Sequence, residues 1–299
     1  MKDRQHNGNR NQTLDLFAVT IRAMRRDELD VLVDWAAAEG WNPGLHDANV
    51  FWATDPEGFV AAELDGELVG GGSIVCYDRT FGFMGFFIVR PDWRGRGLGN
   101  HLWRERLRRI RLRLDASGVV GMDGVFDMQP YYASGGFRFA GRDLRFAGRG
   151  RERQFPEGLV PVTEIPFADL DAYDRAHFPA SRTYFLERWL RMPDSHALAA
   201  LHDGQLAGYG VLRPCREGYK VGPLFAAGID TARDLLHGLT AHIPGETYYL
   251  DVPEDNRDAM QLAAEENMEE VFGCARMYFG PAPDLPLHEI FGVTTFELG

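Results

Sequence analysis

The residues whose types and spacing best fit a chemical role form a short glycine-rich run, Arg94-Gly95-Arg96-Gly97-Leu98-Gly99. The run follows an apolar stretch at 81–89, expected to be a buried strand, and it opens a segment with a helical apolar stripe. Glycine lets the backbone approach a ligand closely, and the first N–H groups of a helix have no partner within the helix. The run therefore predicts a site that binds phosphate groups.

Two common phosphate-binding motifs do not fit this run. A dinucleotide-binding fingerprint needs Gly-x-Gly-x-x-Gly, whereas Gly95, Gly97 and Gly99 alternate. A P-loop needs Gly-Lys-Ser/Thr after four intervening residues, and the run has no such sequence. A tight strand-to-helix turn that binds no ligand stays open as the alternative.

The spacing Arg-x-x-Gly-x-Gly, after a strand with Val89 two residues before Pro91, resembles the acyl-CoA-binding motif of the GNAT-type N-acyltransferase superfamily. Residues 87–99 match the motif, and the layout over about 17–147 is similar to that fold. In this family the N–H groups of the loop hold the CoA pyrophosphate. The resemblance therefore implies acetyl-CoA as cosubstrate, held by Arg94, Gly95, Arg96, Gly97, Leu98 and Gly99.

A second match lies downstream, where Tyr132-Ala133-Ser134-Gly135-Gly136-Phe137 fits the Tyr-x-x-x-Gly-Phe of the family. The resemblance implies Tyr132 as the general acid that protonates the departing thiolate. It also implies that the backbone N–H of Val89 or Ile88 stabilises the negative charge on the thioester oxygen. The alternative for Tyr132 is an aromatic ring packed under a helix.

The general base is not defined by a single residue. Many relatives carry a Glu in the strand that corresponds to 81–89, but this strand contains no carboxylate. Deprotonation of the amine is therefore assigned to water or to one of Glu39, His46 and Asp123, each of which also has a structural or solvent-facing alternative.

The acceptor is expected between Tyr132 and the helix break at Trp41-Asn42-Pro43-Gly44. The candidate substrate residues are Glu39, Trp41 and Asn42, and a carboxylate, Glu39 or Asp47, would pair with an ammonium group. Core packing remains the alternative for the tryptophans of this region.

The elements that must position these residues alternate between helices and strands. The apolar patterns and turn signals predict strands at 17–22, 59–64, 68–76, 81–89, 119–125 and 137–146, and helices at 25–38, 45–54, 98–114 and 129–134. Asp65-Gly66 predicts a tight hairpin turn. Six arginines at 104–113 occupy the face left over by the leucine stripe, so we expect a solvated face rather than a nucleic-acid interface.

The hairpin is repeated in the second half, because residues 62–72 match 200–210 at a constant offset, including an Asp-Gly turn. The second copy lacks Arg-x-x-Gly-x-Gly and has Ala263 where the first has Tyr132. The arrangement resembles two-domain acetyltransferases with a divergent second domain, and Arg276-Met277-Tyr278 and residues 291–299 look typical of that subfamily.

These observations predict tandem GNAT-like domains of the α/β class (α+β mixed sheet). Each domain would have a mostly antiparallel central sheet with a splayed strand pair, flanked by helices. The expected organisation is a disordered leader at 1–13, a catalytic domain at 14–148, a linker at 149–158 and a divergent domain at 159–299 that does not bind acetyl-CoA.

Composition restricts the partners. The formal net charge is −12, with 20 basic and 20 acidic residues in 1–150 but 12 and 24 in 151–299. An acidic half repels nucleic acid and favours a cationic partner. The three cysteines form no CxxC pair, which predicts no metal site and a reducing, cytoplasmic setting. The longest apolar run is about half of the roughly 18 residues that a membrane span needs, and the start of the chain lacks the apolar core of a signal peptide.

The sequence thus predicts an acyltransferase that moves an acetyl group from acetyl-CoA to a primary amine of a small molecule, with a cationic amine favoured by charge. Attack would be direct, in a ternary complex. Two alternatives stay open: a non-catalytic acyl-CoA sensor, and a protein-interaction module in which the acidic half docks a basic partner.

Overall fold

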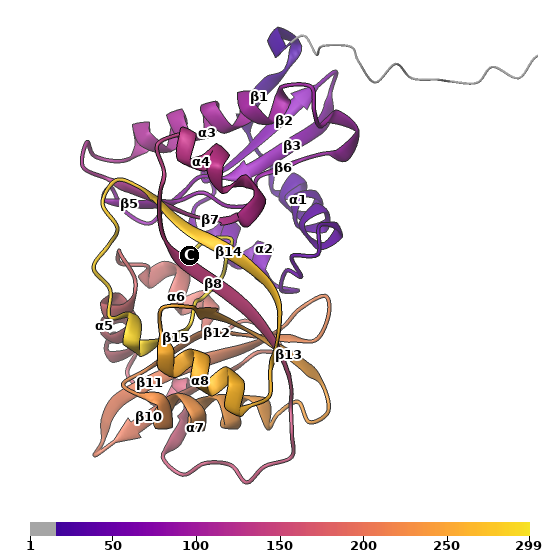
Figure 1. Ribbon diagram of the computed structural model, residues 1–299. Helices are drawn as coiled ribbons and strands as arrows, with labels where there is room; N and C mark the ends of the chain where they lie inside the picture. The colour runs from indigo at the N-terminus through magenta and orange to yellow at the C-terminus, as the bar shows by residue number, and fades with distance from the viewer. Residues whose placement is uncertain (1–15) are drawn as a thin grey trace, which may run out of the picture.

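A computed structural model describes residues 16–299 of the protein (Figure 1). The predicted leader at 1–13 lies outside these residues. The first half contains β1 (Thr20–Ala23), α1 (Arg26–Ala38), α2 (Asp47–Thr54), β2 (Phe59–Leu64), β3 (Glu67–Ser73), β4 (Val75–Cys76), β5 (Phe81–Phe83), β6 (Ile88–Val89), α3 (Leu98–Arg113), β7 (Val119–Val125), α4 (Gln129–Ser134) and β8 (Arg138–Arg149).

The second half contains β9 (Leu159–Pro161), α5 (Phe167–His177), α6 (Thr183–Trp189), β10 (His196–His202), β11 (Gln205–Pro214), β12 (Tyr219–Ala226), α7 (Ile229–Thr240), β13 (Thr247–Pro253), α8 (Arg257–Glu265), β14 (Glu269–Phe279) and β15 (Ile290–Gly292). Short 3₁₀ helices occur at Leu16–Ala18, Pro91–Trp93, Phe126–Met128, Val162–Glu164 and Leu287–Glu289. The first of these stands where the sequence predicts the start of a strand, so that strand begins later, at Thr20.

The repeated Asp-Gly pairs form the same kind of turn in both halves. Asp65 and Gly66 have φ values of 51° and 81° and join β2 to β3, while Asp203 and Gly204 have 51° and 77° and join β10 to β11. Two successive positive φ values match the right-handed twist of a hairpin, and aspartate and glycine tolerate them. The predicted hairpins are therefore confirmed. The strand predicted at 68–76 is divided, because β3 ends at Ser73 and β4 pairs with β5 in a different sheet.

The apolar stretch at 81–89 is two strands and not the single strand predicted from its composition. β5 pairs in parallel with β7, whereas β6 pairs antiparallel with β3 in a different sheet. Between them Phe86 has a φ of +48°, an uncommon conformation for a bulky side chain. An apolar run shows that both ends are buried, but it does not show that they join different sheets.

Two sheets result from this divergence. One has the order β1-β2-β3-β6, and the larger one runs β4-β5-β7-β14-β8-β13-β12-β11-β10-β9, with β15 also paired to β12. The splayed strand pair and the mixed α/β architecture confirm the predicted fold class.

The two halves exchange strands at the centre of the large sheet. β14, from the second half, lies between β7 and β8 of the first half, and β8 pairs in turn with β13 (Figure 1). β8 ends at Arg149, and the next helix or strand that the structure describes is β9. Residues of the second half are thereby brought next to β7.

The segment 293–299 is buried between the halves. Tyr77 Oη donates a hydrogen bond to Leu298 O at 2.8 Å, and Arg182 Nη2 donates one to Thr294 Oγ1 at 2.9 Å. Its side chains join a core that also contains residues of α1, α2 and α6. Among residues 16–299, no helix has the length and apolar character needed to cross a bilayer.

Candidate active site

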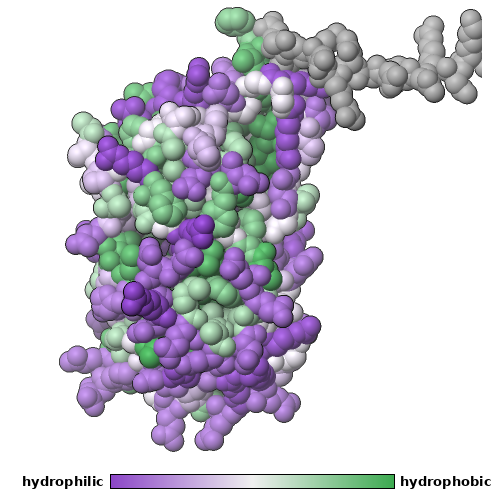
Figure 2. All heavy atoms as spheres, in the orientation of Figure 1, coloured by the Kyte–Doolittle hydropathy of each residue, from purple (hydrophilic) through white to green (hydrophobic). Residues whose placement is uncertain are grey.

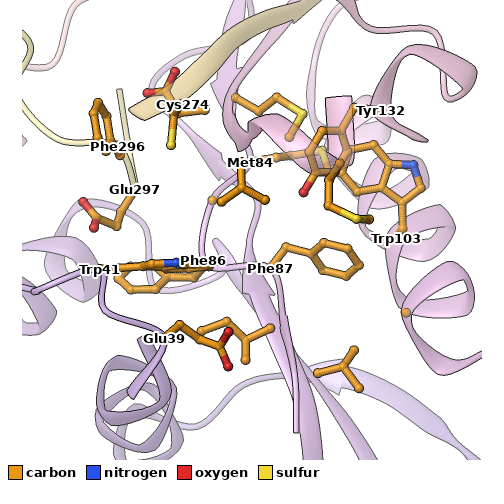
Figure 3. A pocket seen from close by; sticks show the side chains of 18 of the residues that line it. Glu39, Trp41, Met84, Phe86, Phe87, Trp103, Tyr132, Cys274, Phe296 and Glu297 are labelled. Carbon is orange, nitrogen blue, oxygen red and sulfur yellow. The ribbon is translucent and has the colours of Figure 1, made fainter. Parts of the chain in front are cut away.

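A cavity of about 500 Å³ opens where β5 and β6 diverge (Figure 3). The first half supplies the segment 84–89, part of the glycine-rich run and the facing side chains of α3, β7 and α4. The second half supplies Phe272 and Cys274 from β14, and Phe296 and Glu297 from the 293–299 segment. The exchange of strands thus makes this a composite site.

The glycine-rich run forms the turn into α3 at one end of the cavity. Gly95 and Gly97 have φ values of 74° and 89°, and Gly97 is the N-cap of α3 without a side-chain cap. The first N–H groups of the helix are therefore open to a ligand. Leu98 is fully buried and anchors the helix start, while Gly95 and Gly99 line the cavity. A turn with this shape fits a phosphate group.

The two arginines of the run have different surroundings. Arg94 Nε donates to Val89 O at 2.7 Å, and its Nη2 pairs with Glu39 Oε1, so Arg94 ties the turn to β6 and to the end of α1. The Arg96 guanidinium lies 5.0 Å from the centre of the Trp93 ring. Arg94 lines the cavity, and Arg96 adds positive charge beside the turn.

β6 borders the cavity along one edge. It is the last strand of its sheet, with Val89 opposite Gly70 and Ile88 opposite Gly71 on β3. Within residues 16–299 no strand pairs with its other edge. Ile88 and Val89, the implied donors to the thioester oxygen, both line the cavity.

Tyr132 enters the cavity from α4 (Figure 3). Its ring packs 5.0 Å from Trp103, and its edge fits against Gly124, where a Cβ would lie only 2.4 Å away. The hydroxyl has no hydrogen-bond partner in the part of the chain described. Burial raises its pKa to about 12, although the charge of Arg106 opposes this shift. The hydroxyl therefore remains protonated, as a proton donor must.

The three candidate bases lie in different places. Glu39 lines the cavity but is paired with Arg94. Asp123 also lines it, with both oxygens bonded to Arg276 of β14 at 2.5 and 2.8 Å. Burial raises the pKa of Asp123 to about 7, against the lowering effect of Arg276. His46 lies outside the cavity, 3.3 Å from Asp194.

Of the predicted substrate residues, Glu39 and Trp41 line the cavity and Asn42 does not. Trp41 lines the cavity, and its carbonyl oxygen accepts hydrogen bonds from Arg145 Nη1 at 2.9 Å and Lys220 Nζ at 3.2 Å. The Asn42 amide is used elsewhere, because it donates to Glu217 O and accepts from Glu217 N, both at 2.9 Å. Asn42 therefore holds the helix break against the second half.

Asp47 is also in a structural pair. Its carboxylate accepts from Arg213 Nε at 2.9 Å, and both side chains are almost fully buried. Asp47 therefore does not pair with an ammonium group of a substrate. It pairs with Arg213 and so joins α2 to β11.

Arg106 corrects the expectation that the arginines of α3 form only a solvated face. Its side chain is fully buried and lines the cavity, and its Nη2 donates to Ser73 O and Gly85 O, both at 2.6 Å. It thereby joins β3 to the splayed segment. Its Nε and Nη1 have no hydrogen-bond partner in the chain from residue 16 onward, and burial lowers its pKa to about 9.

Glu297 is the carboxylate that the sequence interpretation missed. It is only 4% exposed, and Oε2 is buried without a hydrogen-bond partner among residues 16–299. In the sequence, residues 291–299 indicate only the resemblance to a two-domain subfamily. No local pattern relates residue 297 to 84–89, because the contact depends on how the two halves pack.

Comparison with family models gives two matches that together cover most of the chain. The model described as "Acetyltransferase (GNAT) family" matches residues 22–135, and the one described as "Acetyltransferase (GNAT) domain" matches 170–292. The first match contains the glycine-rich run and Tyr132, and the second falls within the acidic half.

Individual proteins agree with these matches. The chain is 27% identical over 275 residues to holothin acyltransferase of Pseudoalteromonas sp. (strain SANK 73390), covering 91% of this chain and 92% of that protein. It is 33% identical over 105 residues to an acetyltransferase of Pectobacterium atrosepticum, covering 33% of this chain and 69% of the relative. The crystal structure of a putative acetyltransferase from Pyrococcus horikoshii superposes with a TM-score of 0.81 at 23% identity, over 99% of this chain and 100% of that one.

Proposed function

The chain belongs to the GNAT family of acetyltransferases, and from this premise we propose that it moves the acetyl group of acetyl-CoA to a primary amine of a small molecule. Named relatives make it an acyltransferase rather than a sensor or an interaction module. The observation that carries the proposal is the unpartnered Tyr132 hydroxyl in the same cavity as the β6 edge and the glycine-rich turn.

The turn before α3 suits the pyrophosphate of CoA. N–H groups of Gly95, Arg96, Gly97, Leu98 and Gly99 would donate to its oxygens, with Arg94 and Arg96 adding charge. When bound, acetyl-CoA supplies an acyl group activated as a thioester. The free edge of β6 would hold the cosubstrate's arm along the cavity.

The chain's own residues then act on the transfer. A backbone N–H of Ile88 or Val89 donates to the thioester oxygen as charge develops there, and fixed donors of this kind lower the barrier. Tyr132 gives its proton to the sulfur that leaves. Both groups line the same cavity, which supports their acting on one acyl group, and positioning of this kind supplies much of the rate in a ternary complex.

The acceptor would enter on the side of Trp41, opposite Tyr132 (Figure 3). A relative that spans almost the whole chain is named for acting on holothin, which supports a small molecule as acceptor here. The negative excess of residues 151–299, part of which forms the cavity wall, supports a cationic amine.

The test is to incubate the protein with acetyl-CoA and a panel of primary amines, following free thiol and the mass of the product. We expect thiol release that depends on the amine. We also expect a product whose mass exceeds that of the amine by one acetyl group in place of one hydrogen. Thiol release that no amine increases would contradict the proposal.

A further inference from the structure

Glu297 differs from the other acidic side chains that line the cavity. Glu39 is paired with Arg94 and Asp123 with Arg276, whereas Glu297 makes no ion pair or side-chain hydrogen bond within residues 16–299. A buried charge without a partner is costly in a folded protein. An unpaired carboxylate in a cavity therefore points to a partner that arrives from outside the chain.

The backbone around Glu297 is held firmly. The N–H groups of Glu297 and Leu298 donate to Thr295 Oγ1 at 3.1 and 2.9 Å. A Cβ at Gly85 would lie 2.0 Å from Glu297 O, so the glycine lets the segment pack directly on the splayed strands. The segment that carries the carboxylate is thus packed directly on the splayed segment that leads into β6, the strand assigned to position the acyl group.

The cations near Glu297 are engaged with other groups. Arg145 forms two hydrogen bonds with Asp251, Arg213 pairs with Asp47, and Lys220 donates to Trp41 O. All three contribute to the field at Glu297, but none of them forms an ion pair with it. They balance its charge at a distance and leave its oxygens open to a cation.

The apolar side chains around Glu297 also indicate which kind of ligand the cavity suits. Trp41, Phe272 and Phe296 line the cavity beside Glu297, and Figure 3 shows Trp41 and Glu297 on the side of the cavity away from Tyr132. Flat apolar walls next to one carboxylate suit a molecule with an aromatic or aliphatic body and a single positive charge.

We propose that Glu297 binds the ammonium group of an apolar-bodied primary amine and accepts the proton that the amine must lose before it attacks. The inference rests on the proposed function and adds to it the class of acceptor and the base. It replaces the earlier candidates Glu39, His46 and Asp123 in that role.

The ammonium gives one proton to the Glu297 carboxylate, and the freed lone pair of nitrogen forms the new N–C bond to the thioester carbonyl carbon. The C–S bond breaks with its electron pair on sulfur, which takes the proton of Tyr132. The second proton that nitrogen loses passes through water to the Tyr132 oxygen, and Glu297 releases its proton to solvent.

The test uses tryptamine and phenethylamine as acceptors, acetyl-CoA as donor, and thiol release as the readout, with the full chain and its Glu297→Gln variant. At pH 7.5 we expect kcat/KM for both amines to fall at least 100-fold. The affinity for acetyl-CoA, measured by calorimetry, should stay within about twofold, because the Glu297 side chain makes no hydrogen bond or ion pair with the glycine-rich turn among residues 16–299. The melting temperature should stay close to that of the wild type, since the amide removes no ion pair or hydrogen bond.

A pH series separates a base from a structural residue. Alkylammonium groups lose their proton near pH 10.4, so without Glu297 the rate should follow the free amine and rise about tenfold per unit between pH 7 and 9. The wild type should rise much less. The other titratable groups facing the site are present in both proteins, so the ratio of the two rates isolates Glu297. These groups are Glu39, Arg94, Arg106, Asp123, Tyr132, Lys220 and Cys274.

The matched control is Glu270→Gln, which changes an exposed carboxylate on β14 outside the cavity and should leave all readouts unchanged. Equal kcat/KM in the Glu297→Gln variant and the wild type would overturn the inference. A wild type that binds acetyl-CoA but acetylates neither amine would overturn it as well. Failure of the wild type to bind acetyl-CoA would instead overturn the proposed function.

Discussion

Tyr132 has the two properties that a buried proton donor needs. Its hydroxyl is not committed to another group in the chain from residue 16 onward, and burial holds its pKa near 12. An ordinary tyrosine, with a pKa near 10, would begin to lose its proton in mildly alkaline solution. The environment of Tyr132 keeps the proton in place throughout the range in which amines are good nucleophiles.

This property predicts the alkaline side of the pH profile. Because Tyr132 acts in its protonated form and its pKa is raised to about 12, kcat at saturating tryptamine should not fall as pH rises from 7 to 10. The measurement is kcat from thiol release across this range, with protein stability checked at each pH. A fall with its midpoint near pH 8 or 9 would show that another group, and not Tyr132, supplies the proton.

At the same scale, individual residues differ in how far sequence could locate them. The sequence locates Tyr132 and Gly97 because their motifs are local and depend only on spacing. Arg106 stands four residues from both Leu102 and Ile110, in the middle of the apolar stripe of α3, and this spacing was a signal for burial. The charge of the side chain concealed that signal.

At the scale of elements, the turn into α3 determines whether the cosubstrate binds. Gly97 has a φ of 89°, and the helix start behind it carries no side-chain cap. We expect Gly97→Glu to abolish detectable binding of acetyl-CoA, because the new carboxylate would lie where the pyrophosphate is expected and would repel it. Isothermal titration calorimetry measures the loss.

The matched control for that variant is Gly204→Glu. Gly204 has a φ of 77° and nothing within 4 Å of an added Cβ, but it lies in the β10–β11 turn of the second half. Both variants strain a left-handed glycine in a similar way, so only the position relative to the cavity differs. Equal affinities for acetyl-CoA in the two folded variants would show that the turn before α3 does not bind acetyl-CoA.

The element that sequence reasoning misjudged is the one that forms the cavity. Residues 81–89 are apolar throughout, which predicted a single strand, but β5 and β6 pair with β7 and β3 in different sheets. The separation is stabilised by contacts with distant residues, including the bonds from Arg106 to Ser73 O and Gly85 O. Strand propensity contains no information on such contacts.

At the scale of the whole molecule, the site depends on both halves. The exchange of β8 and β14 places Arg276 against Asp123, and the 293–299 segment places Glu297 at the splayed strands. Figure 2 shows hydrophilic residues concentrated over the end of the molecule formed by the second half, with apolar patches nearer its middle. The repeat and the fold class could be predicted from sequence, whereas this exchange could not, because strand order between repeats leaves no local pattern.

The pair formed by Asp123 and Arg276 joins the two halves. Its burial predicts that the difference in stability between Asp123→Asn and the wild type depends on pH. The folded pKa of Asp123 is raised to about 7, above its value of about 3.9 in an unfolded chain. At this carboxyl the folded state therefore holds more protons between these values, and the contribution of Asp123 to the stability of the wild type decreases as pH rises from about 4 to 7. Asp123→Asn removes this contribution, so the free energy of unfolding of the variant relative to the wild type should rise between pH 5 and pH 8, on the order of 3 kcal/mol.

Urea unfolding of both proteins at the two pH values measures this difference. Asp115→Asn, which changes an exposed carboxylate, should give the same difference at pH 5 and pH 8. A relative stability of Asp123→Asn that falls with pH would mean that the pair with Arg276 outweighs burial.

The central claim is that this cavity transfers an acetyl group with Tyr132 as the proton donor, and Tyr132→Phe tests it most directly. The ring and its packing on Trp103 are retained, and only the hydroxyl is lost. With tryptamine and phenethylamine as acceptors, kcat should fall about 10²- to 10⁴-fold, while the dissociation constant of acetyl-CoA changes less than about twofold. Equal kcat in the two proteins would contradict the account.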